Sequence, residues 1–297
     1  MTGPLGVWFT DDAEAFLARA GDALAADPVT GTVIATNARR VAAHGFPPGL
    51  PDRWFALVSG PDGELRGIAM RMMPFAPWAP YLMAMDEAAA VALAEATLAR
   101  GAEVGGVNGL RPAADVFAAT VAARTGTRVE VHLHHRLFEL RTLVEPRSVP
   151  GGLREVREDE EDLALAWIHR FFADADEQAG RPAGHLGEAE AFGMHDVRRK
   201  RAEGTLWVWA DPTDRPVHLV AANPPSYDVV RIGPVFTPAE ERGRGWAGAA
   251  VAELSRRVLA RGERPVLFTD QANPTSNRLY QALGYEPVVD TVQLALR

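Results

Sequence analysis

The sequence predicts an α/β protein of the α+β kind, built from two halves that each mix helices and strands. Its 297 residues, 47% of them hydrophobic, are enough for two domains with buried cores. Segments with helical spacing of apolar residues alternate with short segments typical of strands. Prolines and glycines gather at 145–152, and a similar order of elements begins again after them.

The first half is predicted to begin with a helix and a β-hairpin. Apolar residues at roughly helical spacing predict a helix over 11–25. Segments 54–59 and 65–72 flank a Gly-Pro-Asp-Gly turn, so they are predicted as hairpin strands. The next predicted elements are a short strand at 81–85, an alanine-rich helix at 86–100, a helix after Pro112 and a long strand at 128–140.

Segment 145–152 is the predicted linker, between a first half at 1–144 and a second half at 153–297. The elements predicted after it are a strand at 153–156, helices at 158–173 and 188–202, strands at 206–210, 217–222 and 229–236, a helix at 243–260, a strand at 266–269, a helix at 274–283 and a strand at 288–296. The similar order of elements indicates a duplicated fold, without a residue-level repeat.

Composition and charge exclude several classes of function. The chain has no cysteine, which excludes disulfides, thiolate metal sites and a cysteine nucleophile. Its net charge is −8 and neither half is basic, so no nucleic-acid partner is expected. The sequence shows no signal peptide and no apolar run long enough for a membrane span, so a cytoplasmic protein is expected. His132 and His134 share a strand face but are too few ligands, so no metal site is expected.

A glycine-rich turn opens the predicted helix at 243–260. The first amides of a helix have no partner within it, and the helix dipole favours negative charge there. Gly243 and Gly245 remove side chains that would keep a phosphate away, and Arg242 and Arg244 can add positive charge. The turn therefore predicts an anion-binding cradle, and a flexible turn before an ordinary helix is the alternative. A dinucleotide-binding fold is disfavoured because the glycines come late in the chain.

The strand before this turn carries an interruption at Gly233 and Pro234. Proline cannot donate to a ladder, and glycine within a strand often marks a bulge. A bulge would separate the strand from its neighbour and leave backbone groups that a ligand can pair with.

A second informative segment lies near the end of the chain. Asn273 before Pro274 is typical of a helix N-cap followed by proline at the first helical position. Asn277 and Tyr280 are three residues apart and share a helix face. Gly284 is typical of the residue that ends a helix. Tyr280 is either a proton donor beside a ligand or a core residue.

The cradle and the tyrosine helix, in this order, make the segment from Gly152 onwards resemble the GNAT N-acetyltransferase superfamily. Arg242, Gly245 and Ala247 satisfy the cradle pattern of this family, [RQ]-x-x-G-x-[GA]. The segment NPTSNRLYQALGY at 273–285 is similar to its asparagine-and-tyrosine helix. The whole chain also resembles tandem GNAT proteins with a degenerate N-terminal half. The resemblance implies two GNAT-like domains, each a mixed, mostly antiparallel sheet flanked by helices.

A degenerate first half agrees with the residues at its corresponding helix start. Asp86 and Glu87 stand where a second cradle would need glycines, and two acids would repel a phosphate. This half is therefore expected not to bind CoA. It would cap the acceptor site or stabilise the other half.

The resemblance further implies acetyl-CoA as co-substrate and an N-acetyltransferase acting on a primary amine, of a small molecule first and of a peptide next. The strand before the cradle would pair with the pantetheine arm, the cradle would hold the pyrophosphate, and two asparagines would lie along the cofactor. The predicted cofactor-binding residues are Val235, Phe236, Thr237, Arg242, Gly243, Arg244, Gly245, Trp246, Ala247, Gly248, Asn273 and Asn277.

In the chemistry that the resemblance implies, the amine attacks the thioester directly. A backbone amide near Val235 would stabilise the oxyanion, and Tyr280 would donate to the leaving thiolate. The base stays open between Asp270, Asp228, His218 and a chain of waters. Transfer of a longer acyl group and acyl-CoA binding without turnover are the alternative functions. A monomer or a homodimer is expected.

Overall fold

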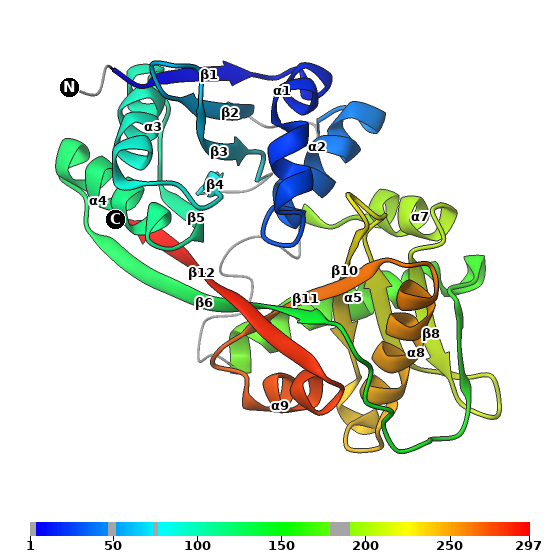
Figure 1. Ribbon diagram of the computed structural model, residues 1–297. Coiled ribbons are helices and arrows are strands. Elements are labelled where there is room, and N and C mark those ends of the chain that lie inside the picture. The colour runs from blue at the N-terminus through cyan, green and yellow to red at the C-terminus, as the bar shows by residue number, and fades with distance from the viewer. Residues whose placement is uncertain (1–3, 47–51, 74–76, 179–190) are drawn as a thin grey trace. The chain divides into compact units, whose positions relative to one another are not determined.

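The structure is a computed structural model that describes residues 4–46, 52–73, 77–178 and 191–297 (Figure 1). By compactness the chain divides into unit 1, residues 1–136 with 289–297, and unit 2, residues 137–288. These compact units do not test the predicted domain boundaries, 1–144 and 153–297 with a linker at 145–152, which stay a prediction.

Unit 1 contains a sheet with strand order β1-β2-β3-β4-β5-β12. Its neighbouring strands are antiparallel except for β4 and β5, which are parallel. The elements are β1 (Gly6–Thr10), α1 (Ala13–Ala26), α2 (Thr32–His44), β2 (Trp54–Ser59), β3 (Leu65–Arg71), β4 (Tyr81–Leu82), α3 (Glu87–Ala99), β5 (Gly106–Leu110), α4 (Ala113–Thr125), the first part of β6 (Val129–Leu140) and the end of β12 (Tyr285–Leu296).

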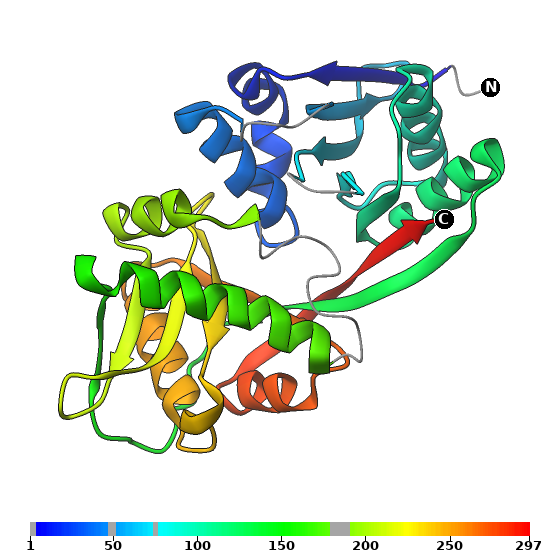
Figure 2. The same cartoon turned by 180° about the vertical axis from the view of Figure 1, so that it is seen from behind.

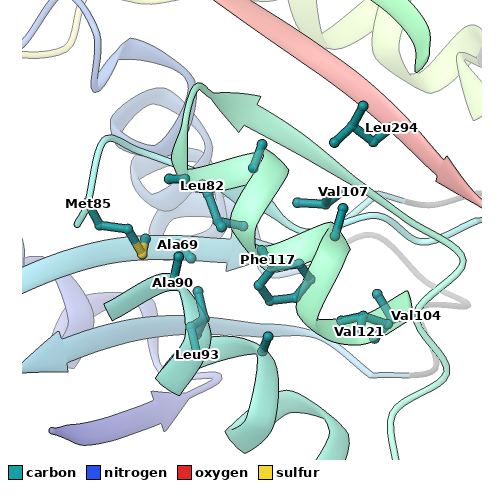
Figure 3. Packing of buried hydrophobic residues seen from close by; sticks show 14 of the residues in the cluster. Ala69, Leu82, Met85, Ala90, Leu93, Val104, Val107, Phe117, Val121 and Leu294 are labelled. Atoms are coloured by element: carbon teal, nitrogen blue, oxygen red, sulfur yellow. The ribbon is translucent and has the colours of Figure 1, made fainter. Parts of the chain in front are cut away.

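The alternation of side chains along β2 explains why helices cover both faces of this sheet. Phe55 stacks on Phe16 of α1, with ring centroids 4.6 Å apart. Trp54 and Ala56 point the other way, into a cluster with α3 and α4. Figure 3 shows that cluster, where Leu294 of β12 packs with residues from α3, α4 and the strands.

Unit 2 contains a sheet with strand order β6-β11-β10-β9-β8-β7, in which β10 and β11 are parallel. Its elements are the end of β6, β7 (Gly152–Glu155), the short helix η1 (Glu158–Glu160), α5 (Glu161–Gln178), α7 (Met194–Ala202), β8 (Leu206–Ala210), β9 (Pro216–Ala222), β10 (Val229–Phe236), the short helix η2 (Ala239–Glu241), α8 (Trp246–Ala260), β11 (Arg264–Asp270), α9 (Pro274–Ala282) and the start of β12.

Two separate apolar clusters lie on the faces of the second sheet. Val220 and Ala222 of β9 pack with α8, whereas Leu219 and Ala221 pack with residues of α5 and α7. Figures 1 and 2, seen from opposite sides, show α8 on one face of these strands and α5 on the other. The cavity described below is formed at the end of β10, where both helices contact this strand.

Among the described residues, and leaving aside the short helices η1 and η2, the order strand, two helices, three strands, helix, strand, helix, strand occurs twice. This confirms the predicted fold class of two domains that each mix a mostly antiparallel sheet with helices. Each sequence half ends in a long strand that continues into the other compact unit. Residues 291–295 of β12 pair with β5 of unit 1, and residues 137–140 of β6 lie in unit 2, where β6 neighbours β11.

Some element boundaries differ from the prediction. The cradle helix begins at Trp246 and not at Gly243, because Gly243 and Gly245 have positive φ angles of 77° and 87° that no helix contains. The strand predicted at 81–85 is only Tyr81–Leu82. Strands β1 and β5 and helix α2 were not indicated by the sequence. The predicted helix start at Glu188 lies outside the described residues.

Candidate functional site

A cavity of about 560 Å³ opens in unit 2 between the end of β10, the start of α8, the start of α9 and the C-terminal turns of α5. All the residues predicted to bind the cofactor line this cavity except Asn277, and the predicted catalytic residue Tyr280 lines it too. The structure therefore brings together two segments of the sequence that were singled out independently.

The strand β10 separates from β11 at this cavity. The two strands pair only from Val229 to Arg231. On the other side, the pairing of β10 with β9 has a bulge between Ile232 and Val235, where Gly233 has a φ of 148°. Residues 232–236 thus leave β11, and their backbone edge on that side faces no strand among the described pairs. An extended ligand can add to this edge in the way that a further strand would.

Backbone amides without intrahelical partners lie at the start of α8. Its first hydrogen bond within the helix runs from the amide of Ala249 to the carbonyl of Gly245, at 3.1 Å. The amides of residues 246–248 come before it and have no intrahelical acceptor. Gly245, with its positive φ, caps the helix without a side chain, so nothing of its own covers these amides. They lie at the turn where the sequence predicts an anion-binding cradle.

The two arginines of the cradle are held by the protein itself. Arg242 donates from Nε to the carbonyl of Thr237 at 3.1 Å and from a terminal nitrogen to the carboxylate of Asp174. Arg244 lies 3.3 Å from a carboxylate oxygen of Glu241. Both arginine side chains stay about half exposed, with 45% and 55% of their surface accessible. A guanidinium carries five N–H donors, so each arginine has more donors than these contacts use.

Glu241 contacts side chains on both sides of the glycine turn. Only 5% of this residue is exposed, and its carboxylate lies 2.8 Å from Arg215 and 3.4 Å from the indole nitrogen of Trp246, the first residue of α8. The hydrogen bond from Arg215 lowers the pKa of Glu241, and the hydrogen bond from Trp246 and the charge of Arg244 act in the same direction. An ionised Glu241 therefore fixes the side chains on both sides of the turn.

Tyr280 comes from α9 and is 6% exposed, yet it lines the cavity. Its ring meets that of Tyr285 edge to face, with centroids 5.9 Å apart. Burial raises the pKa of Tyr280 above its usual value, so the phenol stays protonated. Its hydroxyl has no hydrogen-bond partner among the described residues, whereas that of Tyr285 is bonded to Ser255 at 2.8 Å. Tyr280 is thus a buried donor at the cavity wall.

The two asparagines of the α9 segment have different positions. Asn273 lines the cavity and caps α9, accepting the amide of Ser276 at 3.0 Å. Asn277 is not part of the cavity wall. Its side chain accepts from Thr269 at 2.6 Å and donates to the carbonyls of Asp270 and Asn273 at 3.0 and 2.8 Å. It therefore holds the loop between β11 and α9 together.

None of the three side chains considered as a base lines the cavity. His218 is fully buried, with Nδ1 2.8 Å from the hydroxyl of Thr237, and burial lowers its pKa to about 3. Asp270 accepts the amide of Ala272, and Asp228 lies in the turn before β10. The carboxylates that do line the cavity, Asp174 and Glu241, were not found from the sequence.

The corresponding helix start in unit 1 is closed by a carboxylate. Asp86 caps α3 and accepts the amide of Ala89 at 2.9 Å, and Arg66 donates to the same carboxylate at 2.9 Å. The hydrogen bond from Ala89 lowers the pKa of Asp86, so the carboxylate is ionised at neutral pH. The N-cap position of α3 thus carries the anionic side chain of Asp86, whereas the N-cap position of α8 is Gly245, which has no side chain.

Comparisons with known proteins give one family-model match and several similar folds. Residues 215–294 match the family model described as FR47-like protein. A GCN5-related N-acetyltransferase from Sphaerobacter thermophilus is similar in structure, with a TM-score of 0.59 and 17% identity over 98% of this chain and 94% of that chain. A GNAT-family acetyltransferase from Colwellia psychrerythraea has a TM-score of 0.56 and 12% identity, covering 98% of this chain and 100% of the other.

A tandem GNAT protein from the clavulanic acid biosynthesis pathway has a TM-score of 0.55 and 14% identity, and 98% of each chain is covered. No curated protein gives a significant match to the sequence. These similarities confirm the predicted resemblance to GNAT proteins in fold along nearly the whole chain, and residues 215–294 also match the family model. Among the described residues, no helix has the length and apolar character needed to cross a membrane.

Proposed function

Because residues 215–294 match the GNAT-type FR47-like family and the chain shares its fold with GNAT acetyltransferases, we propose that this protein is an acetyl-CoA-dependent N-acetyltransferase. Its acceptor is a primary amine, of a small molecule first and of a peptide next. One observation carries the proposal: a single cavity holds the bare amides of α8, the unpaired edge of β10 and the buried phenol of Tyr280.

The donor fits the two backbone features of the cavity. The diphosphate of acetyl-CoA binds the amides of residues 246–248, where the helix dipole favours negative charge. The pantetheine arm pairs along Val235 to Thr237, which β11 leaves unpaired. This orientation brings the thioester from the start of α8 along β10 towards Tyr280. Asn273 lies on the cavity wall beside that path.

The reaction is a direct transfer. The neutral amine attacks the thioester carbonyl carbon, the C–S bond breaks, and the CoA thiolate leaves while the new amide nitrogen loses its proton to solvent. A backbone amide of the bulged strand near Val235 stabilises the oxyanion, and loss of one such donor typically costs about 10² to 10³ in rate. No base is assigned, since the described cavity wall carries only carboxylates already paired with arginines.

Tyr280 stabilises the leaving group by a hydrogen bond. Complete proton transfer from a phenol of pKa about 10 to a thiolate of about 8.5 is uphill by about 2 kcal/mol even without perturbation. Burial raises the pKa of Tyr280 further, which makes complete transfer less favourable and keeps the donor protonated at every pH where the amine is reactive. A hydrogen bond to the thiolate needs no complete transfer, because a thiolate is a stable anion.

The proposal is tested by two measurements on the full chain. Calorimetry with CoA measures binding, and a thiol-release assay with acetyl-CoA and a panel of primary amines measures turnover. We expect binding and amine-dependent thiol release. Binding without release for any amine would favour an acyl-CoA sensor, and faster release from longer acyl-CoA donors would favour transfer of a longer acyl group. Absence of binding would refute the proposal.

A further inference from the structure

The turn between β8 and β9 contacts the cradle from outside the cavity wall. It ends with Arg215, whose guanidinium lies 2.8 Å from a carboxylate oxygen of Glu241. Glu241 lines the cavity, whereas Arg215 is not part of the cavity wall that the described residues form. Arg215 can therefore act on the cradle through Glu241, without a contact to the ligand.

Asp211 folds this turn and orients Arg215. One oxygen of its carboxylate accepts the amides of Thr213 and Arg215 at 2.9 and 3.2 Å, and the other accepts Nε of Arg215 at 3.2 Å. Asp214 of the same turn accepts from Nε of Arg154 in β7 at 2.8 Å. The guanidinium of Arg215 is thus directed towards Glu241 by a turn that has further contacts of its own.

Glu241 places a negative charge at a site that is proposed to bind a polyanion. Only 5% of this residue is exposed, and the hydrogen bond from Arg215 is the largest cause that lowers its pKa, so the carboxylate is ionised at neutral pH. The carboxylate lies 3.4 Å from the indole nitrogen of Trp246, the first residue of α8. Its charge therefore opposes the helix dipole, which favours an anion at this end of the helix.

The two arginines beside Glu241 respond differently to a bound diphosphate. Arg244 lies 3.3 Å from Glu241 and lines the cavity, so a diphosphate shares its charge. Arg215 lies outside the described wall and keeps its charge for Glu241 when the cradle is occupied. It also faces Oε1 of Glu241, which leaves Oε2 to Trp246 and Arg244. Arg215 thus both neutralises the carboxylate and fixes its orientation.

We propose that Arg215 is a positioning residue for the donor: it compensates the charge of Glu241 and holds this side chain against Trp246, so that the start of α8 can bind a diphosphate. The inference rests on the proposed function, since it takes the diphosphate of CoA as the ligand of the cradle. It adds a residue that belongs neither to the described cavity wall nor to the cradle pattern. Loss of Arg215 should weaken donor binding only while residue 241 is charged.

The test is a double-mutant cycle that measures CoA binding by calorimetry on the full chain. Its variants are Arg215→Met, Glu241→Gln and the two substitutions together, with Arg215→Lys to keep the charge. Arg256→Met is the matched control, because Arg256 lies on α8, is 47% exposed where Arg215 is 54% exposed, and is not in the described cavity wall. Circular dichroism identifies any variant that does not fold, and Arg215→Gln replaces Arg215→Met if that variant fails.

Arg215→Met should weaken CoA binding by about fivefold or more, at the lower end of typical coupling between sites. In the presence of Glu241→Gln, the same substitution should change the dissociation constant by less than about twofold. Arg215→Lys should stay closer to the wild type than Arg215→Met, and Arg256→Met should stay within about twofold of the wild type. With any amine that supports turnover, Arg215→Met should raise the KM for acetyl-CoA and leave kcat unchanged, because the diphosphate is bound alike in the ground state and the transition state.

Two results would overturn the inference. One is an Arg215→Met variant that binds CoA as tightly as the wild type. The other is a loss of affinity that Glu241→Gln does not remove, since Arg215 would then act on the turn or on the ligand and not through the charge of Glu241. A wild type that does not bind CoA at all would instead refute the proposed function.

Discussion

Replacement of Gly245 by aspartate tests whether the start of α8 holds a diphosphate. Gly245 has a φ of 87°, and a Cβ built there lies 3.0 Å from a methyl carbon of Val149. Any side chain thus adds backbone strain of about 1–2 kcal/mol and a tight contact. Aspartate adds a negative charge, worth about 3 kcal/mol of repulsion per phosphate charge at about 5 Å and an effective dielectric constant of about 20.

The matched control is Gly245→Asn, which has the same shape, tolerates a positive φ and carries no charge. The difference between the two variants isolates the electrostatic contribution. At about 3 kcal/mol, it predicts that Gly245→Asp binds CoA at least about 10²-fold more weakly than Gly245→Asn. Calorimetry measures both dissociation constants. Equal affinities of the two variants would refute the placement of the diphosphate at this helix start.

Three further predictions follow from other parts of the molecule. Tyr280→Phe keeps the buried ring and removes the hydroxyl. The lost hydrogen bond to a charged leaving group should lower turnover in the thiol-release assay by about 10- to 10²-fold, with the CoA dissociation constant unchanged; unchanged turnover would remove Tyr280 from the mechanism. CoA should bind at a single site per chain in calorimetry, because Asp86 closes the corresponding helix start, and a second site of similar affinity would contradict this. His218 has a pKa of about 3 in the folded protein and 6.5 as a reference, so the unfolded state takes up the proton first and stability is lost as the pH falls below 6.5. Urea unfolding should therefore show that the wild type loses about 2 kcal/mol more than His218→Asn between pH 7 and pH 5. The control is His195→Asn, because His195 is exposed; this variant should lose as much unfolding free energy between pH 7 and pH 5 as the wild type. If the wild type and His218→Asn lost stability in parallel as the pH falls, the lowered pKa of His218 would be contradicted.

The glycine turn before α8 and its place beside α9 could be predicted because they depend on local backbone geometry. Glycines before a helix and an asparagine followed by proline are signals that a short segment carries by itself. Asp174 could not be predicted in this way. It is 68 residues from Arg242 along the chain, and an aspartate near the end of a helix has no feature that distinguishes it from a solvent-exposed one.

Asn277 illustrates the limit of a helical-face argument. Asn277 and Tyr280 are three residues apart, and the prediction that one helix contains both is correct. The face alone does not determine hydrogen-bond partners. The amide of Asn277 is bonded to Thr269 and Asp270 at the end of β11 and to Asn273 at the start of α9. Which of two neighbouring asparagines contacts the cavity is thus decided by tertiary contacts that spacing does not contain.

The sequence pattern did not predict strand β5, and its glycines explain why. Its sequence GVNGL holds two glycines, which weaken any strand signal. Gly109 has a φ of 142°, and a Cβ there would lie 2.2 Å from the carbonyl oxygen of Leu82. The close approach of β4 requires glycine at this position. The same glycine lowers the strand propensity of the segment, so the strand could not be predicted from the sequence.

The pairing of β12 with β5 has a consequence for how the chain is synthesised. The ribosome makes β5 early, but residues 291–295, which complete its ladder, emerge only after all of unit 2. Until then the nascent chain exposes one edge of a sheet and lacks Val292 and Leu294, which are buried in that core. A stop codon just before codon 291 would therefore damage the part of the protein that was translated first.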